Sequence, residues 1–253
     1  MDSCRFSQKE RNVLLYNDGK AGFLTTIIGP MFSEKSGELI KRCLQAREYQ
    51  NKHVEVFKPR LDNRFSDDEV VSRIGLRMKA HSIHQDLSQV DIPGEILAPC
   101  QDAHMVAFDE AQFFSQELVG IVELLLQEGK HVIVAGLNLD YLGRPFGCIG
   151  TLLLFSDEIV TKSAFCKCCG RPAMYTQRLV DGKPISRTEE DERLVVIGDS
   201  ESYEPRCRLC VVKKIWSNWI RGGVFPWRSV PPQRGIWRGF ACYTGSCSAA
   251  WPS

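Results

Sequence analysis

The order of three patterns within residues 22–44 constrains the fold more than any other feature of the chain. Gly22–Ile28 is apolar and rich in β-branched residues, which is typical of a buried strand. A short loop follows, and apolar residues then recur at helical spacing, at Leu39, Ile40, Cys43 and Leu44. A strand, a loop and a helix in this order predict an α/β fold with a binding loop at the carboxyl end of the strand.

The loop itself, Gly29–Ser36, fits the phosphate-binding pattern G-x-x-x-x-G-K-[ST] except at one position. In such a loop, backbone N–H groups and the start of the next helix form a concavity for phosphate oxygens. Lys35 would reach the β- and γ-phosphates of a nucleotide, and the Ser36 hydroxyl would ligate Mg²⁺. The pattern therefore predicts ATP contacts along the whole loop, at Gly29, Pro30, Met31, Phe32, Ser33, Glu34, Lys35 and Ser36.

Glu34 stands where the pattern has its second glycine. Glycine gives this position permissive dihedral angles and lets the backbone approach the phosphates closely. A carboxylate here would also face phosphate, and two unit charges ~4 Å apart repel by about 4 kcal/mol at an intermediate dielectric. Alternatively, Glu34 captures Lys35 in an ion pair. Either effect predicts weakened ATP binding.

Strand and helix patterns alternate from residue 21 to about residue 163, which predicts a parallel sheet covered by helices. Further strands are expected at His53–Lys58, Met105–Phe108 and His131–Leu137. A strongly apolar helix is expected at Leu118–Leu126, and the charged stretch Arg60–Arg73 is interpreted as a loop.

An acidic pair, Asp109 and Glu110, follows the short apolar strand Met105–Phe108. Ligands of such sheets bind beyond the carboxyl ends of the strands, so the pair is expected near the phosphate-binding loop. One carboxylate can orient Mg²⁺, and its neighbour can take a proton or align a nucleophile. The alternative is a pair of solvated carboxylates in a turn.

Cys166-x-x-Cys169 and Cys207-x-x-Cys210 are two pairs that can each offer two thiolates to one tetrahedral Zn²⁺. A four-thiolate site is closed to substrate, so this zinc is predicted to be structural. Tyr175–Val180 and Arg193–Ile197 are candidate strands between the pairs. Cys168 is interpreted as a bystander. The remaining cysteines are interpreted as buried or free thiols, at Cys4, Cys43, Cys100, Cys148, Cys242 and Cys247.

Composition excludes several classes of protein. A net charge of +1 argues against a chain that binds nucleic acid through overall charge. No apolar run approaches membrane-spanning length, and the first residues lack the apolar core of a secretory signal. The eleven cysteines are then better explained by metal binding than by disulfides. We therefore expect a cytoplasmic protein with no membrane contact.

The two ends of the chain differ from its centre. Residues 1–20 are polar and are interpreted as a flexible arm. Residues 213–253 contain all five tryptophans, six Lys or Arg between Lys213 and Arg238, and no acidic residue. This tail is interpreted as disordered, and the alternative is a basic, aromatic arm for nucleic acid or another acidic partner.

Several separated motifs occur together and carry a resemblance to a known family. They are Gly29-Pro-Met-Phe-Ser-x-Lys-Ser, Asp62-Asn-Arg64-Phe-Ser, Phe108-Asp-Glu-Ala-Gln-Phe-Phe114, Val134-Ala-Gly-Leu137, Arg144-Pro-Phe-Gly147, the two cysteine pairs and Glu201-Ser-Tyr-Glu-Pro205. In this order they resemble the thymidine kinases of the cytosolic, zinc-containing class (type II) over about residues 21–212. The resemblance implies a RecA-like P-loop domain at 21–163 and a small zinc domain at 164–212 that carries a lasso-shaped loop, roughly Thr176 to Glu204.

The resemblance also implies a reaction, transfer of the γ-phosphate of ATP to the 5′-hydroxyl of thymidine, and it implies roles for named residues. Glu110 would be the general base, and Asp109 would hold Mg²⁺ with Ser36. Lys35 and Arg64 would stabilise the charge of the transferring phosphoryl group, Asp62 would support that loop, and Gln112 is counted among the residues that bind ATP. Taken alone, Asp62 and Arg64 fit a solvated loop equally well.

By the same resemblance, the lasso would close over the thymine base, and apolar or aromatic side chains would form the site. These are Met31, Phe113, Leu137, Tyr141, Phe146, Thr176, Val196 and Tyr203. A homotetramer and feedback inhibition by dTTP are implied as well. Two rival interpretations stay open: a relative that binds thymidine or dTTP with little turnover because of Glu34, and a P-loop ATPase that acts on nucleic acid.

Overall fold

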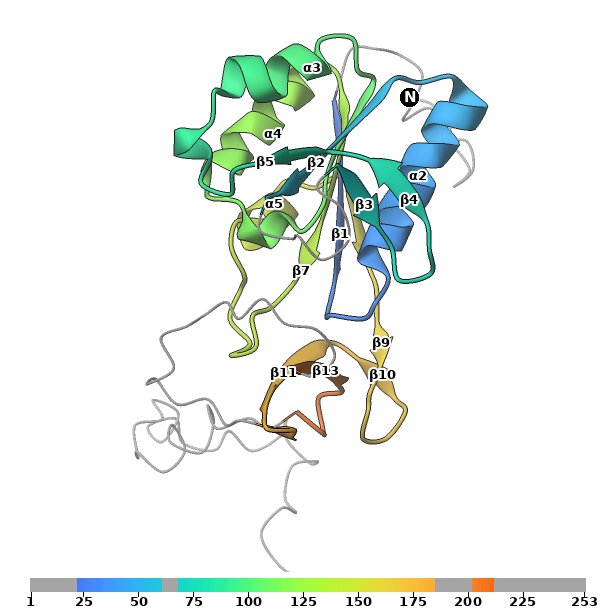
Figure 1. The fold of residues 1–253 in the computed structure, drawn as a ribbon, viewed down its shortest axis with the longest axis vertical. Helices are drawn as coiled ribbons and strands as arrows, with labels where there is room; N and C mark the ends of the chain where they lie inside the picture. The colour runs from blue at the N-terminus through green and yellow to red at the C-terminus, as the bar shows by residue number, and fades with distance from the viewer. Residues whose placement is uncertain (1–21, 61–67, 185–201, 212–253) are drawn as a thin grey trace, which may run out of the picture. The chain divides into compact units, whose positions relative to one another are not determined.

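A computed structural model of the chain describes residues 22–60, 68–184 and 202–211, which belong to one compact unit (Figure 1). The motif residues Asp62 and Arg64, the predicted strand Arg193–Ile197, the arm at 1–20 and the tail at 213–253 lie outside these residues. The larger part of the unit is a six-stranded sheet in the order β5-β2-β6-β7-β1-β8, with every neighbouring pair parallel. Its strands are β1 (Phe23–Gly29), β2 (Val54–Pro59), β5 (His81–Ile83), β6 (Met105–Phe108), β7 (His131–Leu137) and β8 (Glu158–Thr161).

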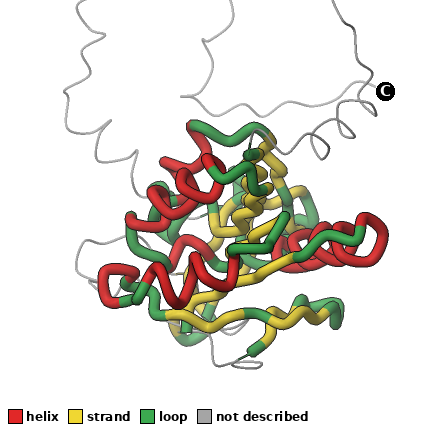
Figure 2. The backbone as a smooth tube through the Cα atoms, turned by 90° about the horizontal axis from the view of Figure 1, so that it is seen from above, coloured by secondary structure: helices red, strands yellow, loops and turns green. Residues whose placement is uncertain are grey.

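Helices cover both faces of this sheet (Figure 2). One face packs against α2 (Lys35–Gln50), and the other packs against α4 (Glu117–Gln127), α5 (Ile149–Leu154) and the short α3 (Ala98–Cys100). Strand β7 shows how one sequence serves both cores, because alternate side chains of a strand point to opposite faces. Val132 and Val134 enter the core with α4, whereas Ile133 and Ala135 enter the core with α2. The predicted α/β fold with a parallel sheet is therefore confirmed.

One sequence-based interpretation is wrong. Part of the charged stretch Arg60–Arg73 is not a loop, because β3 (Glu69–Val71) pairs antiparallel with β4 (Arg77–Lys79). The hairpin forms because Val70 and Met78 are opposite each other and both enter the core against α2. Each strand has three residues and one fully buried side chain. The alternation of apolar and polar residues is therefore too short to be recognised in the sequence. Three short helical segments were also not predicted, η1 (Leu87–Gln89), the π-helical η2 (Ile92–Leu97) and η3 (Ala111–Phe113).

A second, smaller set of strands follows the parallel sheet and is antiparallel throughout. Strands β9 (Ala164–Phe165) and β10 (Pro172–Ala173) form a hairpin, and β11 (Tyr175–Val180) lies between β12 (Lys183–Pro184) and β13 (Tyr203–Arg206). The predicted strand Tyr175–Val180 is confirmed, and its partners in the described residues are β12 and β13. Thr176 pairs with Pro205 and Gln177 with Glu204, so the two ends of the expected lasso lie side by side. Among the described residues, no helix has both the length and the apolar character that crossing a membrane requires.

A buried histidine lies at the first position of β7 and makes the sheet sensitive to pH. Its Nε2 lies 3.0 Å from the Thr25 hydroxyl, and Thr25 also donates to Glu158 at 3.1 Å. Glu158 in turn accepts two hydrogen bonds from Arg42 on α2. Burial, and then the nearby charge of Arg42, lower the pKa of His131 from 6.5 to about 4, although Glu158 acts in the opposite direction. His131 is therefore neutral in the folded protein at pH 7.

His131→Gln should flatten the acid side of the stability profile. Because the pKa of His131 is lower in the folded than in the unfolded chain, the unfolded chain binds the extra proton between pH 6.5 and 4, and native stability falls as the pH falls through this window. A pKa lowered by this amount corresponds to a loss of about 3 kcal/mol in the free energy of unfolding as the pH falls. The His131→Gln protein should not show this loss, because glutamine does not bind a proton in this range. Urea unfolding of both proteins at several pH values tests this. Equal losses between pH 6.5 and 4 would contradict it.

Candidate active site and metal centre

The phosphate-binding loop runs from the last residue of β1 to the first turn of α2. A Cβ at Gly29 would lie 2.4 Å from the Lys162 carbonyl oxygen and 2.6 Å from Ser33 Oγ, so only glycine fits at this position. Ser33 Oγ donates to the Pro30 carbonyl oxygen at 2.8 Å, and Lys35 Nζ donates to the same oxygen at 2.9 Å. The loop is thus closed on itself by two side chains, and Lys35 is held at its mouth.

Lys35 is only 7% exposed, and burial lowers the pKa of its ammonium group from the ordinary lysine value. The charges of Glu110 and Asp109 oppose this effect, whereas the charge of Arg73 adds to it. The two acidic residues and the lysine therefore interact electrostatically across the site, as the P-loop interpretation requires.

Glu34 adopts the left-handed conformation, with φ 58° and ψ 40°. This is a conformation that glycine adopts without steric cost and other residues adopt rarely, which explains the glycine of the general pattern. The side chain does not capture Lys35, whose Nζ binds Pro30 instead, so that prediction is wrong. Glu34 Oε2 is buried without a hydrogen-bond partner, beside the first turn of α2 near Gly37. A buried unsatisfied oxygen costs about 1–3 kcal/mol, which makes this position a strained one.

The acidic pair lies at the carboxyl end of β6, two strands away from β1 in the sheet. Asp109 is 5% exposed and accepts a hydrogen bond from the Ser36 side chain. Burial, and then the negative charge of Glu110, raise the pKa of Asp109 to about 7, against the lowering effect of Ser36 and Lys35. The contact brings together the two residues that were predicted to hold Mg²⁺, a hydroxyl and a carboxylate, which are oxygen ligands that this ion prefers.

Gln112 holds the carboxylate of Glu110, the second residue of the acidic pair, in place. The sequence alone did not indicate this contact. Gln112 Nε2 donates to Glu110 Oε2 at 2.5 Å, and its Oε1 accepts the backbone N–H of Leu137 at 2.9 Å. Gln112 is 2% exposed and connects η3 to the end of β7. Glu110 is itself left-handed, with φ 48°. Its carboxylate is therefore oriented by a buried amide, as a general base would have to be.

Among the described residues predicted to bind the base, two pairs are in contact. Met31 of the phosphate-binding loop donates its backbone N–H to Thr176 Oγ1 at 3.1 Å, which joins the loop to β11. The rings of Phe113 and Phe146 pack edge to face, with centroids 5.7 Å apart. The remaining three, Leu137, Tyr141 and Tyr203, are buried.

The Tyr141 ring lies beneath the Arg178 guanidinium, with 5.3 Å between Cζ and the ring centroid. Arg178 belongs to β11 and pairs with Tyr203 of β13, so this contact connects the loop after β7 to the antiparallel strands. Asp140 beside Tyr141 accepts from the backbone and the side chain of Arg144, which closes that loop. Sequence reasoning did not identify Arg178 or Asp140, since neither belongs to a recognisable spacing. Asp62, Arg64 and Val196 lie outside the described residues.

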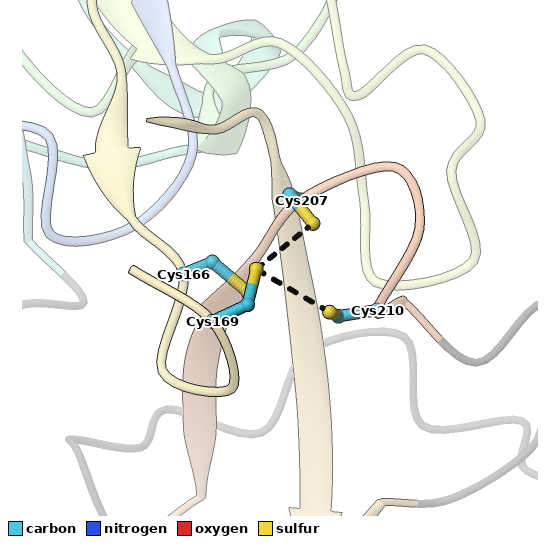
Figure 3. Close-up of side chains that lie close together, drawn as sticks. All are labelled: Cys166, Cys169, Cys207 and Cys210. Carbon is cyan, nitrogen blue, oxygen red and sulfur yellow. Dashed lines mark hydrogen bonds between the residues drawn. The ribbon is translucent and has the colours of Figure 1, made fainter. Parts of the chain in front are cut away.

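The four predicted metal ligands come together (Figure 3). Cys166 and Cys169 lie in the turn between β9 and β10, and Cys207 and Cys210 lie directly after β13. All four Sγ atoms lie within 4.8 Å of one another, and Cys169 Sγ is 3.6 Å from those of Cys207 and Cys210. A tetrahedral zinc site with Zn–S bonds of ~2.3 Å has sulfur atoms about 3.8 Å apart. The cluster can therefore hold a metal ion, and its donor set fits Zn²⁺.

The cysteine between the ligands is not part of the cluster. Cys168 is exposed, and its sulfur contacts the guanidinium of Arg206 rather than the other thiols. The bystander interpretation of Cys168 thus agrees with its position. Backbone N–H groups of Cys207 and Cys169 point at Cys166, and they hold its pKa down to about 7 although burial acts in the opposite direction. Thiolates are the metal-binding form, so these amides favour metal binding.

The comparison with known protein families agrees with this geometry. A family model described as thymidine kinase matches residues 22–211, which include the phosphate-binding loop, the acidic pair and all four clustered cysteines. The match supports a kinase that transfers phosphate and, in general, phosphorylation of thymidine. The cysteine cluster is consistent with the zinc-containing, type II class of the family. The chain therefore belongs to the thymidine kinase family.

Proposed function

We propose that the protein is an ATP- and Mg²⁺-dependent thymidine kinase that produces thymidine monophosphate and ADP. The observation that carries the proposal is the assembly around Asp109. Its carboxylate is bonded to Ser36 of the phosphate-binding loop, and it interacts with the charges of Lys35 and Glu110. A phosphate-binding loop, a magnesium ligand and a candidate base within one site are the groups that phosphoryl transfer needs.

In the proposed reaction Glu110 accepts the proton of the thymidine 5′-hydroxyl. The hydroxyl oxygen then forms a bond to the γ-phosphorus, the bond from that phosphorus to the β–γ bridging oxygen breaks, and ADP leaves with the electron pair. Lys35 would leave Pro30 and contact the β- and γ-phosphates, where Arg64 would also act. Ser36 and Asp109 would hold the Mg²⁺ that binds with ATP, and this ion would supply positive charge to offset the phosphates.

The thymine base is proposed to lie among the groups that join the loop after β7 to the antiparallel strands. Phe113 and Phe146 offer an aromatic wall, and Thr176 and Tyr203 lie at the two ends of the lasso. A flat apolar base needs such walls and a few fixed polar groups. The lasso would exclude water from the transfer, and Val196 is proposed as a further contact.

Further properties of the family class are proposed for this chain. The cysteine cluster would hold a structural Zn²⁺, because four thiolates leave no open position for substrate. We also propose the division into a kinase domain at 21–163 and a zinc domain at 164–212, a homotetramer, feedback inhibition by dTTP and a cytoplasmic location. A nucleic-acid-dependent ATPase has no support among the contacts of the described residues.

A second candidate is a relative that binds nucleotide with little turnover. It is favoured by the left-handed Glu34 and its buried, unpaired Oε2. The position of that oxygen beside α2, rather than on Lys35, favours the active enzyme instead.

The test is conversion of thymidine to its monophosphate by the native chain and by Glu34→Gly. We expect both proteins to be active and Glu34→Gly to lower the KM for ATP by about threefold, because glycine adopts the left-handed conformation without cost and removes one negative charge. The KM for thymidine should not change. Activity of the glycine variant alone would establish the impaired relative. If neither protein turns over thymidine while both are folded and contain zinc, the proposed function is wrong.

A further inference from the structure

The first turn of α2 has a glycine where any side chain would meet Glu34. A Cβ at Gly37 would lie 2.9 Å from Glu34 Oε2, closer than the 3.0 Å that real Cβ atoms keep. The next contact would be Ser72 Cβ at 3.5 Å, an ordinary van der Waals distance. Among the described residues, the group that a Cβ at residue 37 would approach too closely is therefore the Glu34 carboxylate. That carboxylate occupies space that exists because residue 37 is glycine.

The turn of the β3–β4 hairpin lies beside this space, since Ser72 Cβ is the second atom near a Cβ at residue 37. Ser72 is buried, and its position is fixed by hydrogen bonds with Leu76, whose backbone N–H donates to Ser72 Oγ at 3.0 Å. The next residue, Arg73, lies over the ring of Phe32 in the phosphate-binding loop, with 4.2 Å between Cζ and the ring centroid. The hairpin therefore contacts the loop through Arg73 and Phe32, and Glu34 Oε2 is buried nearby, in the first turn of α2.

Charge explains why the position of this carboxylate matters. The charge of Arg73 lowers the pKa of Lys35, and the charge of Glu34 raises it. Lys35 is the residue expected to contact the β- and γ-phosphates. Glu34 Oε2 lies beside Gly37 in the first turn of α2. There it makes no hydrogen bond with the loop amides that would donate to phosphate oxygens. In the mouth of the loop the same charge would repel the phosphates directly, and Coulomb repulsion at short range is strong in a partly buried site.

We propose that Gly37 is a positioning residue for the phosphate donor: it holds the Glu34 carboxylate against the flank of α2 and so keeps the phosphate-binding loop open to ATP. This inference rests on the proposed function, because it assumes that the loop binds ATP. A methyl group at residue 37 would displace the end of a flexible side chain, so the fold would persist while the carboxylate moves. Gly37 thus allows the loop to carry a glutamate at a glycine position.

The test is a double-mutant cycle on the affinity for Mg-ATP, measured by isothermal titration calorimetry. Its four proteins are the native chain, Gly37→Ala, Glu34→Gly and the double variant. Gly37→Ala should raise the Kd for Mg-ATP about tenfold in the native background, a small part of the repulsion between close unit charges. With Glu34→Gly present, the same change should alter the Kd by less than about twofold, since no carboxylate remains to be displaced. The KM for thymidine should stay at the native value in all four.

Gly120→Ala is the matched control, because a Cβ at Gly120 on α4 would meet nothing within 4 Å. It should raise the Tm through helix propensity and leave the Kd unchanged. An equal rise in Kd for Gly37→Ala in both backgrounds would overturn the inference and assign a purely structural effect to the methyl group. An unchanged Kd in the native background would overturn it as well. If none of the four proteins binds Mg-ATP, the proposed function fails together with the inference.

Discussion

Glu110→Gln should lower kcat for thymidine phosphorylation by about 10²- to 10⁴-fold, the usual contribution of a general base. Glutamine has the same shape and can still accept the hydrogen bond that Gln112 Nε2 gives to Glu110 Oε2. The geometry of the site should therefore persist, and what is lost is the ability to take a proton from the 5′-hydroxyl. The KM values for ATP and thymidine should stay within about threefold of the native values, because the lost interaction belongs to the transition state.

The matched control is Glu117→Gln, which removes a carboxylate from the exposed start of α4 and should leave kcat unchanged. Steady-state kinetics with saturating Mg-ATP compare the three proteins. A kcat for Glu110→Gln within threefold of the native value would show that another group accepts the proton. An equal fall in kcat and rise in both KM values would point to a distorted site rather than to a lost base.

The sheet was predictable where a strand is buried on both faces. Met105–Phe108 and His131–Leu137 have in the structure the bounds that their continuous apolar runs predict. The hairpin of β3 and β4 was not predictable, because Val70 and Met78 are its only buried apolar residues and charged residues lie close to them in the sequence. This omission matters for function, since the hairpin brings Ser72 and Arg73 to the phosphate-binding loop.

Sequence patterns indicated which residues could form the candidate site, but they did not indicate how those residues contact one another. The spacing of Lys35, Ser36 and Asp109 indicates their chemistry, and the structure brings them together. The direction of the Glu34 side chain depends on the absence of a side chain at residue 37. The phosphate-binding pattern ends at Ser36, so it gives no information on this position. Likewise, the bond from Gln112 to Leu137 requires β6 and β7 to be neighbours, a fact of sheet order that local sequence does not contain.

The antiparallel strands give a further example of what spacing can and cannot establish. Two Cys-x-x-Cys pairs predict one four-sulfur site whatever lies between them, because two thiolates from each pair complete a tetrahedron. They do not identify the strands that support the site. In the described residues β13 begins at Tyr203 and leads directly into Cys207. The buried Tyr203, the end of the expected lasso and two of the clustered cysteines therefore lie on this strand and the residues directly after it.

With the proposed zinc bound, the cysteine cluster would be the main stabilising element of the antiparallel strands. Their buried cluster contains Ala164, Ala173 and the cysteines Cys166 and Cys207, with Phe32 of the phosphate-binding loop packed against it. Sheets of two and three strands with so little apolar area are unstable by themselves. A structural zinc contributes about 10–16 kcal/mol of apparent binding free energy, which is coupled to folding. Without metal, the strands should therefore unfold.

Cys207→Ser should abolish stoichiometric zinc and raise hydrogen exchange throughout β11 and β13, while exchange in β6 and β7 stays slow. Because Thr176 on β11 accepts the backbone N–H of Met31, loss of these strands should weaken thymidine binding by at least about 100-fold, with a smaller effect on Mg-ATP.

Cys168→Ser is the matched control, since the Cys168 sulfur lies outside the four-sulfur cluster. This variant should retain one zinc per chain and native hydrogen exchange. Zinc content and exchange mass spectrometry separate the outcomes. If Cys207→Ser retains one zinc and protected strands, the cluster does not hold this part of the fold together; loss of zinc in Cys168→Ser would instead make that cysteine a ligand.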